Sequence, residues 1–441
     1  MPAPVVHFLT RKPLVNNARV FKQAASLSGA GYDVLLVGVR RGGLPERERR
    51  DGIPIVRVGH DPLPRRLSHW ARRDGGSPTT VRELGTPPSG GGGRARRAVM
   101  RAARAAGTLP WLLQSAAFYA RAYRLLRGAV PAPAVVHVTD LNALLPGVLL
   151  ARRHGVPLVY DAQELYTGIH TLPPRYRALL GLQERLLLRH VDRLVAVNPA
   201  IADAMRERYG RAADAVVLNC PPYRDAAPAG DIRARLGLPA GAPVLVYSGG
   251  LLPARGIEQT LLALHHLPGA VLVALGEGEL RPELEALADR EGLRDRVRFH
   301  GFVPPEEVPG FIASADVGVV PYRDVGLNHR LCSPSKLFHY LMAGLPVACS
   351  DLPFLRAVAL GDGVGTVFDP GSPAAIAEAV SSILAAPEPY RARVAAVRER
   401  YSWEHEERRF LGVYATLPSS ARPPASPRPA PPSAAPSPRP S

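Results

Sequence analysis

The chain alternates short apolar runs with helix-like segments. Such alternation implies parallel strands joined by crossover helices, and therefore a doubly wound sheet. The runs are continuously apolar, as expected for strands covered on both faces. In the first half we expect strands at Val5–Leu9, Asp33–Val39, Ile53–Val58, Val135–Val138, Leu158–Asp161, Arg193–Val197 and Ala215–Leu218, and helices at Asn17–Gly29, Leu141–His154, Pro174–His190 and Ala200–Tyr209.

The alternation breaks at Asn219, where the segment NCPPYRDAAPAGD is rich in proline, alanine and glycine. Proline interrupts helices and strands, so this segment is expected to connect two domains. We therefore predict an α/β protein with two Rossmann-like doubly wound domains, 1–222 and 223–400, facing each other across a cleft. In the second domain strands are expected at Pro243–Tyr247, Ala270–Leu275, Val297–His300, Asp316–Val320, Pro346–Cys349 and Gly365–Phe368, with a helix at Gly256–Leu267.

The net charge of +17 is concentrated outside these two domains' regular patterns. Residues 64–107 hold ten arginines against two acids, a net of +8, within a Gly-rich insertion at 60–107. The Pro/Ala/Ser/Arg segment 417–441 adds +3 and has the composition of a disordered tail. Because the excess is not spread along a folded groove with interleaved aromatic residues, nucleic-acid binding is not expected.

The composition also favours a reducing compartment. The three cysteines include no Cys-x-x-Cys pair, so neither a disulfide framework nor a zinc site is indicated. No apolar run reaches the roughly 18 residues that a membrane span needs, and the first residues lack the order of a signal peptide. We expect a cytoplasmic protein, with peripheral attachment to the inner face of the membrane as the alternative.

The peripheral alternative rests on the aromatic and basic helix predicted at Leu109–Leu126. Packing of this helix on the edge of the sheet is the favoured interpretation. Attachment to anionic lipid, helped by the preceding arginines, is the other.

The turn after the first strand of the second half favours anion binding. Ser248, Gly249 and Gly250 end that strand, and Arg255-Gly256 opens a helix. Small residues allow the backbone to approach an anion, and the free N–H groups of a helix start favour negative charge. Arg255 would add a charged contact to phosphate oxygens.

Lys336 is the second candidate, because the chain strongly prefers arginine. Of its 55 basic residues only Lys12, Lys22 and Lys336 are lysines. A lysine kept at a helix start suggests a need for a compact ammonium group. With Arg255 at a neighbouring strand end, it would form a dicationic clamp for a diphosphate and would help it to depart.

The other loops that follow predicted strands also contain candidate binding residues. Glu277 lies between Gly276 and Gly278, which allow close approach, and Phe302-Val303 offers an apolar surface for a flat base. Asp140, Asp161 and Glu164 end strands of the first half and face the predicted cleft; sugar or acceptor binding and helix capping remain equal alternatives.

Several other kinds of site are not indicated. No Asp-x-Asp pair stands near a strand end, so a divalent metal bridging a diphosphate is not expected. There is no Gly-x-Ser-x-Gly elbow, and no Gly-x-Gly-x-x-Gly turn follows the first strand. His265 and His266 lie among leucines of a predicted helix and are expected on the surface.

Together these motifs resemble the retaining GT-B glycosyltransferases of glycosyltransferase family four. The segment SKLFHYLMAGLPVACSD is similar to that family's SKLFEYMAAGKPVVASD, and SGGLLPARGIEQTLLAL to its donor-site turn. VRFHGFVPPEEVPGFIASADVGVVPY resembles its base-binding loop, VYDAQELY its VYDAHELY pattern, and SWEHEERRFLGVYATL its closing helix. The last match implies that a helix at 401–416 returns to the first domain.

The resemblance implies transfer of a sugar from a nucleoside-diphosphate donor to an unidentified acceptor, with retention and without a cofactor or metal. It assigns a ribose contact to His339 and an acceptor-side role to Asp140. The sugar is expected to face Asp161, Gln163 and Glu164, and the donor to be bound by Gly249, Gly250, Arg255, Glu277, Phe302, Val303, Ser335, Lys336, Leu337 and His339.

The chain also departs from that family. The two glutamates of its Glu-x7-Glu motif are Leu331 and His339 here, and the histidine of the YDAHE pattern is Gln163. Glutamine hydrogen-bonds a sugar but does not exchange a proton near neutral pH. Two alternatives therefore stay open: a non-catalytic protein that binds a nucleotide sugar or a partner, and a sugar-nucleotide epimerase of the same fold.

Overall fold

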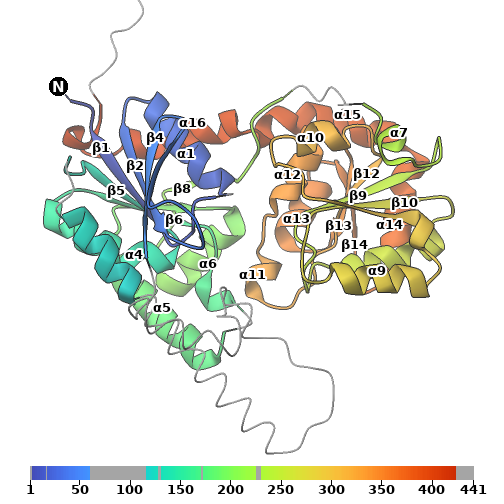
Figure 1. The fold of residues 1–441 in the computed structure, drawn as a ribbon, viewed down its shortest axis with the longest axis horizontal. Coiled ribbons are helices and arrows are strands. Elements are labelled where there is room, and N and C mark those ends of the chain that lie inside the picture. Colours follow the sequence, from blue (N-terminus) through green and yellow to red (C-terminus); the bar gives the residue numbers. More distant parts are fainter. Residues whose placement is uncertain are drawn as a thin grey trace, which may run out of the picture.

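The computed structural model describes residues 2–15, 17–59, 116–127, 131–169, 172–224 and 230–423. It contains two α/β domains side by side (Figure 1). The first holds an eight-stranded sheet in the order β3-β4-β2-β1-β5-β6-β7-β8, parallel except for β3. Its strands are β1 (Val5–Thr10), β2 (Asp33–Val39), β3 (Arg47–Arg50), β4 (Ile53–Val58), β5 (Val135–Thr139), β6 (Leu158–Ala162), β7 (Arg193–Ala196) and β8 (Ala215–Val216).

The second domain holds a six-stranded parallel sheet in the order β11-β10-β9-β12-β13-β14. Counted within the domain, this is the 3-2-1-4-5-6 order of a Rossmann fold. The predicted α/β class with two doubly wound sheets is therefore confirmed. The strands are β9 (Val244–Ser248), β10 (Val271–Leu275), β11 (Val297–Gly301), β12 (Val317–Val320), β13 (Val347–Ser350) and β14 (Gly365–Phe368).

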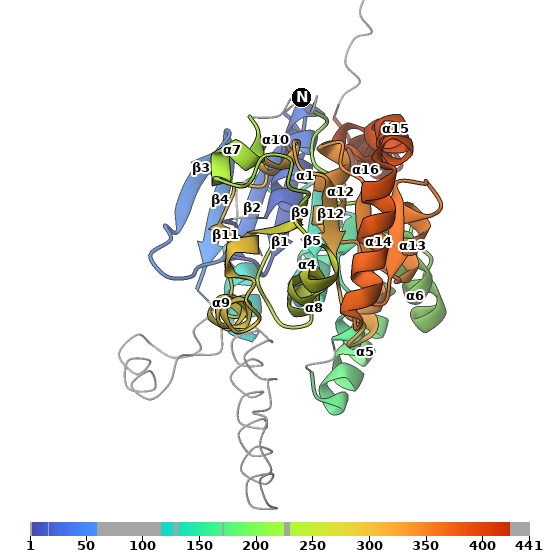
Figure 2. The same ribbon diagram turned by 90° about the vertical axis from the view of Figure 1, so that its right-hand side faces the viewer.

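Helices cover both faces of each sheet, which explains why the strands are apolar throughout. In the first domain α4, α5 and α6 share one core with the sheet, and α1 and α16 share the other. Figure 2 turns the second domain toward the viewer. In this domain α10, α12 and α13 cover one face, and α8, α9 and α14 cover the other. Their bounds are α1 (Ala18–Gly29), α4 (Leu141–His154), α5 (Pro174–Leu188), α6 (Pro199–Tyr209), α7 (Ile232–Leu236), α8 (Ile257–Leu262), α9 (Arg281–Arg290), α10 (Val308–Ile312), α11 (Leu327–Arg330), α12 (Ser335–Met342), α13 (Pro353–Ala359), α14 (Pro373–Ala385), α15 (Pro387–Val397) and α16 (Trp403–Ala415).

Strand β3 is an element that the sequence analysis did not predict. It pairs antiparallel with β4 at the edge of the sheet, and Arg47–Arg50 is charged because one side of an edge strand faces water. The connecting Asp51 and Gly52 both have positive φ, at 51° and 78°. An Asp-Gly pair with this geometry is a strong hairpin signal, so the turn was readable although the strand was not.

The amphipathic helix is described over residues 116–127. Phe118, Ala122 and Leu126 lie on one face at intervals of four residues and are fully buried, and Phe118 and Ala122 pack with Val39 and Val58. This part of the helix therefore packs on the sheet, as predicted, although it covers β2 and β4 and not the edge strand β3. The basic insertion 60–107 lies outside the described residues. None of the described helices is long and apolar enough to cross a bilayer.

Helix α16 carries the chain back to the first domain, as the resemblance implied. Trp403, Phe410 and Tyr414 are buried in the core that α1 forms with the sheet, and Tyr414 Oη lies 2.8 Å from His137 Nδ1 on β5. Residues 417–423, which were assigned to the tail, continue this packing with Leu417 and Ala421 buried. The rest of the tail, 424–441, lies outside the described residues.

Candidate active site

The loops that leave β9 and β10 touch through glycines. Gly249 has φ +131° and Gly276 has φ +132°, conformations that other residues rarely adopt. A Cβ atom on Gly276 would lie 2.1 Å from Gly249 O, and one on Gly249 would lie 3.3 Å from Lys336 Nζ. The carboxyl ends of these strands and the start of α12 therefore meet, as predicted.

Lys336 is a buried cation at this meeting point. Its side chain lies in the first turn of α12, and its Nζ is 3.4 Å from the centroid of the Tyr247 ring and 5.3 Å from that of Tyr322. Nζ is buried and has no hydrogen-bond partner among the described residues. An ammonium group held by aromatic faces, with its donors unused, is ready to accept an anion.

Arg255 is the second cation of the clamp. Its guanidinium carbon lies 4.2 Å from the centroid of the Tyr322 ring, which Lys336 also approaches. Burial lowers the pKa of Lys336 well below its usual range, and the charge of Arg255 lowers it further. The two cations are therefore close enough to repel each other.

The loops beside the clamp place the other donor-side residues. Phe302 follows β11 with 60% of its side chain exposed, an unusual degree for a phenylalanine, whereas Val303 packs partly into the core. Glu277 follows Gly276, and its carboxylate accepts a hydrogen bond from Arg281 Nη1 at 2.8 Å. Phe302 thus offers a free aromatic face at this sheet edge.

Within α12 the assigned residues have different surroundings. Ser335 is exposed, and Leu337 is fully buried in the core and donates its N–H to Pro334 O at 3.1 Å. The side chain of Leu337 therefore packs the domain, and the donor contact assigned to this residue stays a prediction. His339 is partly buried, and burial with the nearby charges of Lys22 and Lys336 lowers its pKa to about 4.

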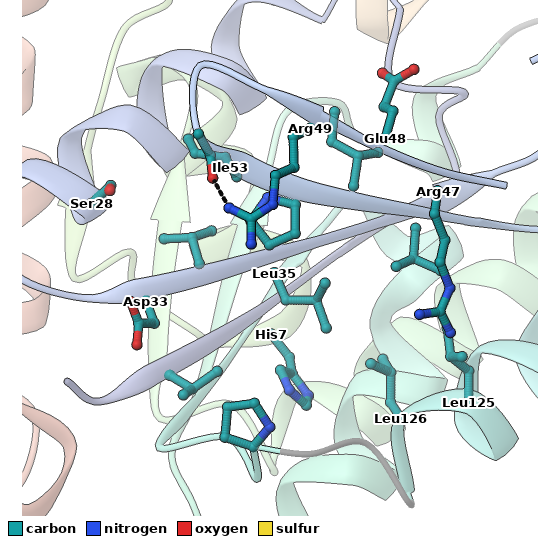
Figure 3. A pocket seen from close by; sticks show the side chains of 17 residues that line it. His7, Ser28, Asp33, Leu35, Arg47, Glu48, Arg49, Ile53, Leu125 and Leu126 are labelled. Carbon is teal, nitrogen blue, oxygen red and sulfur yellow. Dashed lines mark hydrogen bonds between the residues drawn. The ribbon is translucent and has the colours of Figure 1, made fainter. Parts of the chain in front are cut away.

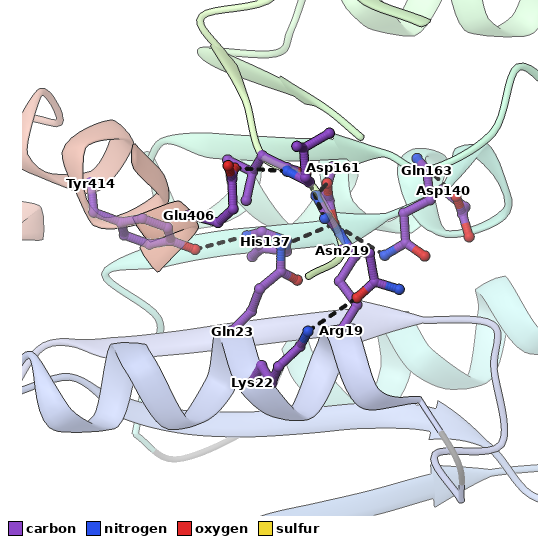
Figure 4. A network of polar contacts seen from close by, with 12 residues as sticks. Arg19, Lys22, Gln23, His137, Asp140, Asp161, Gln163, Asn219, Glu406 and Tyr414 are labelled. Carbon is purple, nitrogen blue, oxygen red and sulfur yellow. Dashed lines mark hydrogen bonds and ion pairs between the residues drawn. The ribbon is translucent and has the colours of Figure 1, made fainter. Parts of the chain in front are cut away.

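Asp161 has a different place from the one expected. Its carboxylate is fully buried and accepts hydrogen bonds from Arg19 Nε at 2.9 Å, Arg19 Nη2 at 2.6 Å, Gln23 Nε2 at 3.1 Å and Gln163 Nε2 at 3.1 Å (Figure 4). Arg19 holds the pKa of Asp161 down to about 2 despite its burial. A carboxylate so occupied orients Gln163 and does not face a sugar.

Asp140 lies next to Gln163 and is paired. Its carboxylate lies 3.0 Å from Lys12 Nζ and accepts the N–H of Gln163 at 3.3 Å, and Lys12 Nζ also donates to Gln163 Oε1 at 2.7 Å. The side chain makes no capping hydrogen bond to α4. Asp140 has φ 65° and ψ 157°, a region that is almost exclusive to glycine. Helix capping is therefore excluded, and strain at this residue is typical of a functional position.

Glu164 interacts electrostatically with charged groups of both domains. Its side chain is exposed, and the surrounding protein and Asp140 raise the pKa of its carboxyl, while Lys12 and Arg255 oppose this. Lys12 belongs to the first domain and Arg255 to the second, so the loop after β6 and the donor-side clamp face each other.

Direct contacts join the domains beside these loops. Asn328 on α11 accepts the N–H of Leu165 through Oδ1 at 3.0 Å. Asn198 at the start of α6 donates through Nδ2 to Leu331 O at 2.8 Å and to Ser333 Oγ at 3.0 Å. Both contacts involve the loop between β12 and α12, which leads to Lys336.

The sequence analysis gave no role to Lys12, Lys22 and Arg19. It also did not identify Tyr247 and Tyr322, whose rings lie beside Lys336 and Arg255. Lys22 on α1 donates to Asn219 Oδ1 at 3.3 Å and to Cys220 O, and its Nζ lies 4.8 Å from the Trp403 ring centroid. The rarity of lysine, used for Lys336 alone, would have singled out Lys12 and Lys22 as well.

A separate pocket lies at the opposite end of the first sheet (Figure 3). Its volume is about 1040 Å³, and it is lined where strands begin, by Val5, Asp33 and Ile53, with His7 among the lining residues. Ligands of open α/β sheets bind at the carboxyl ends of strands, so this pocket does not belong to the site.

Comparison with known proteins agrees with this geometry. The family described as glycosyl transferases group 1 matches residues 229–400, and a glycosyl transferase 4-like domain matches residues 17–221. D-inositol 3-phosphate glycosyltransferase of Xylanimonas cellulosilytica is 30% identical over 64% of this chain and 71% of its own length. 2-deoxystreptamine glucosyltransferase of Streptomyces kanamyceticus is 29% identical over 62% of this chain and 74% of its own.

Solved structures share the fold. Sucrose-phosphate synthase from Thermosynechococcus elongatus has a TM-score of 0.67 at 19% identity, covering 93% of this chain and 98% of its own. HepE from Anabaena, solved in complex with UDP-glucose, has a TM-score of 0.67 at 16% identity, covering 94% and 100%. The chain therefore belongs to the glycosyl transferases group 1 family and is a glycosyltransferase with the GT-B fold.

Proposed function

We propose that the chain transfers a sugar from a nucleoside-diphosphate sugar to an acceptor hydroxyl, with retention at the anomeric carbon. The observation that carries this proposal is Lys336, a buried ammonium group without a hydrogen-bond partner among the described residues, placed beside Gly249 and near Arg255. A diphosphate would supply the missing acceptor atoms and offset the repulsion between the two cations. The complex of HepE with UDP-glucose supports the same class of donor.

The rest of the donor would lie along the neighbouring loops. The exposed ring of Phe302 would stack on the base, with Val303 beside it. His339, whose pKa of about 4 keeps it neutral, would hydrogen-bond the ribose. Glu277 is paired with Arg281 and would border the donor through the backbone of its loop.

The acceptor side would be formed by the first domain. Gln163, fixed by Asp161 and Lys12, would hydrogen-bond the transferred sugar, and Glu164 and Asp140 would border the acceptor. The bond from the anomeric carbon to the diphosphate oxygen breaks, the acceptor oxygen bonds on the same face, and its proton passes to the departing phosphate oxygen. This route asks no side chain to exchange a proton, which agrees with Gln163. Lys336 and Arg255 would stabilise the leaving diphosphate without a metal or cofactor.

Calorimetry against UDP, GDP and ADP and their sugars tests the donor site. We expect one nucleotide to bind the wild-type chain, and Lys336→Ala to weaken it by ten- to hundredfold, on the order of a lost charged hydrogen bond. Lys12→Ala, in the other domain, is the matched control: it should keep the affinity for the free nucleotide and lower the transfer rate. Absence of nucleotide binding, or equal binding by Lys336→Ala, would contradict the proposal.

The fate of the sugar separates the alternatives. Incubating the donor with candidate acceptors such as inositol phosphate and 2-deoxystreptamine, and following the anomeric proton by NMR, should show transfer with retention. A donor that is bound and neither transferred nor hydrolysed would instead indicate a binding protein. Conversion of the nucleotide sugar to its epimer without an acceptor would indicate an epimerase.

A further inference from the structure

Helix α5 presents a stripe of leucines to solvent. Leu179, Leu182 and Leu186 are 48%, 54% and 46% exposed, and their spacing of three and four residues places them on one face. They are three of the nine large apolar residues that are exposed in the described part of the chain. Isolated exposed leucines are ordinary, but an aligned row along one helix is typical of an interaction surface.

The same face of α5 carries only positive charge. At 100° per residue Arg175, Arg185 and Arg189 fall with the leucines within an arc of about 120°. All three arginines are exposed. The single acid of the helix, Glu184, lies on the opposite side and is fully buried.

Glu184 fixes which way this face points. Its two carboxylate oxygens accept hydrogen bonds from Tyr160 Oη and Tyr209 Oη, both at 2.7 Å. Because β6 and α6 supply these tyrosines, rotation of α5 that would bury the leucines would break both bonds. The apolar and basic face is therefore held outward by the core of the domain.

Helix α4 extends the face. Leu149 is 43% exposed, and Arg152 and Arg153 lie one turn further on the same side of a helix that has no acidic residue. Arg152 Nη2 lies 3.2 Å from the ring nitrogens of His190, just beyond the end of α5, so the two helices adjoin there. Both helices lie along the lower left margin of the first domain in Figure 1. We call these leucines and arginines of α4 and α5 the Leu/Arg face.

We propose that the Leu/Arg face docks the protein on an anionic membrane surface. Four leucines would enter the boundary between headgroups and acyl chains, and five arginines would contact lipid phosphates. The uniform sign of charge favours this occupant, because a protein surface of ordinary composition would require acidic counterparts at matching points. The proposal is independent of the proposed reaction and of the helix at 116–127, whose Phe118, Ala122 and Leu126 are already buried.

Sedimentation with lipid vesicles tests the docking. The full chain should bind vesicles of phosphatidylcholine with phosphatidylglycerol, bind phosphatidylcholine alone weakly, and lose binding as salt is raised. The triple variant Leu179→Gln, Leu182→Gln, Leu186→Gln should bind at least about tenfold more weakly, because its apolar contribution is removed. Leu360→Gln is the matched control, since Leu360 is 46% exposed on the second domain; its binding should equal that of the wild type.

Three results would overturn the proposal: no vesicle binding by the wild-type chain, equal binding by the triple variant, or equal loss in Leu360→Gln. A deletion of residues 64–107 should be compared with the triple variant in the same vesicle assay. Binding that needs those residues and is unaffected by the triple variant would assign docking to that segment and not to the Leu/Arg face.

Insertion of the α5 side chains into the bilayer can be measured directly by tryptophan fluorescence, without relying on a loss of vesicle binding. Tryptophan introduced by Leu182→Trp should be quenched by brominated acyl chains in anionic vesicles, and tryptophan introduced by Leu360→Trp should not. Quenching of neither, or of both equally, would count against the proposal.

Discussion

Lys336 combines two properties that seldom occur together: it is buried, and no described carboxylate hydrogen-bonds to it. Its charge is tolerated through the faces of Tyr247 and Tyr322, while burial and Arg255 favour the neutral amine. A diphosphate would reverse that balance, because an anion in contact favours the ammonium form. Donor binding and protonation of one side chain should therefore be coupled.

We expect donor affinity to fall as the pH rises through the lowered pKa of Lys336, at pH values where an ordinary lysine remains charged. The sign follows because the free protein holds the amine partly neutral and the complex holds it charged, so binding takes up a proton. Calorimetry with the nucleotide sugar in buffers of different ionisation enthalpy measures this uptake.

Lys336→Arg provides the comparison, since arginine stays protonated at all accessible pH values. It should bind the donor, if more weakly, without proton uptake. Equal uptake by the wild type and Lys336→Arg would place the titrating group elsewhere.

At this scale the sequence analysis placed Gly249 and Phe302 directly after strands and Lys336 at the start of a helix, and the structure has all three there. Their contacts with a donor stay predictions. Asp161 was misjudged because its partner Arg19 is 142 residues away, and no local pattern indicates that the two side chains meet.

Strand β4 controls a loop of the site through one buried side chain. Arg57 is 2% exposed; its Nε donates to Pro13 O at 2.7 Å and its Nη2 to Leu14 O at 2.8 Å, and Glu48 pairs with it at 2.7 Å. Leu14 itself has a positive φ of 55°. The loop after β1 thus keeps an unfavourable conformation because a guanidinium holds its carbonyl groups, and that loop carries Lys12.

Arg57→Lys should loosen this loop without removing the charge. Loss of the forked donors should lower the free energy of unfolding by about 2 kcal/mol. It should also reduce the transfer rate while the affinity for the free nucleotide stays unchanged, because Lys12 lies in the first domain. Urea unfolding, calorimetry and initial rates measure the three quantities.

Arg50→Lys is the matched control, since Arg50 donates to Val15 O at 2.9 Å from the exposed edge strand. Its stability should change by less than about 0.5 kcal/mol. A parallel fall of donor affinity and transfer in Arg57→Lys would show that the loop acts through the whole fold and not through Lys12.

The parallel strands of both sheets were predictable because strands that are buried on both faces have continuously apolar sequences. The bounds of β2, β4, β14 and α4 agree with the prediction residue for residue. The edge strand β3 escaped because its sequence, Arg-Glu-Arg-Arg, has no apolar side to recognise.

Polar contacts between the two domains add to the two chain segments that connect them, the segment after β8 and the segment before α16. Asn198 Oδ1 accepts the N–H of Ile201 at 2.8 Å and so caps α6, while its Nδ2 reaches Leu331 and Ser333 of the other domain. Such pairs of distant loops could not be derived from the sequence, because each loop is unremarkable alone.

Asn198→Asp separates these two tasks. The carboxylate keeps the cap but cannot donate, and it would repel Leu331 O. We expect a larger radius of gyration by small-angle scattering and a lower transfer rate, with little loss of thermal stability. Asn198→Ala, which removes the cap too, should lose about a further 1 kcal/mol of stability. Unchanged scattering by Asn198→Asp would mean that the two asparagine contacts do not set the domain arrangement.

The return of α16 makes the first domain the last to be finished during synthesis. Its strands and α1 leave the ribosome early, yet Phe8 and His137 stay uncovered until Phe410 and Tyr414 are made. By the time these two residues leave the ribosome, the entire second domain has emerged and can fold on its own contacts. Until then the face of the first sheet that α16 covers stays exposed to solvent. A nascent chain stalled near residue 400 would therefore expose this apolar surface and would be a target for chaperones.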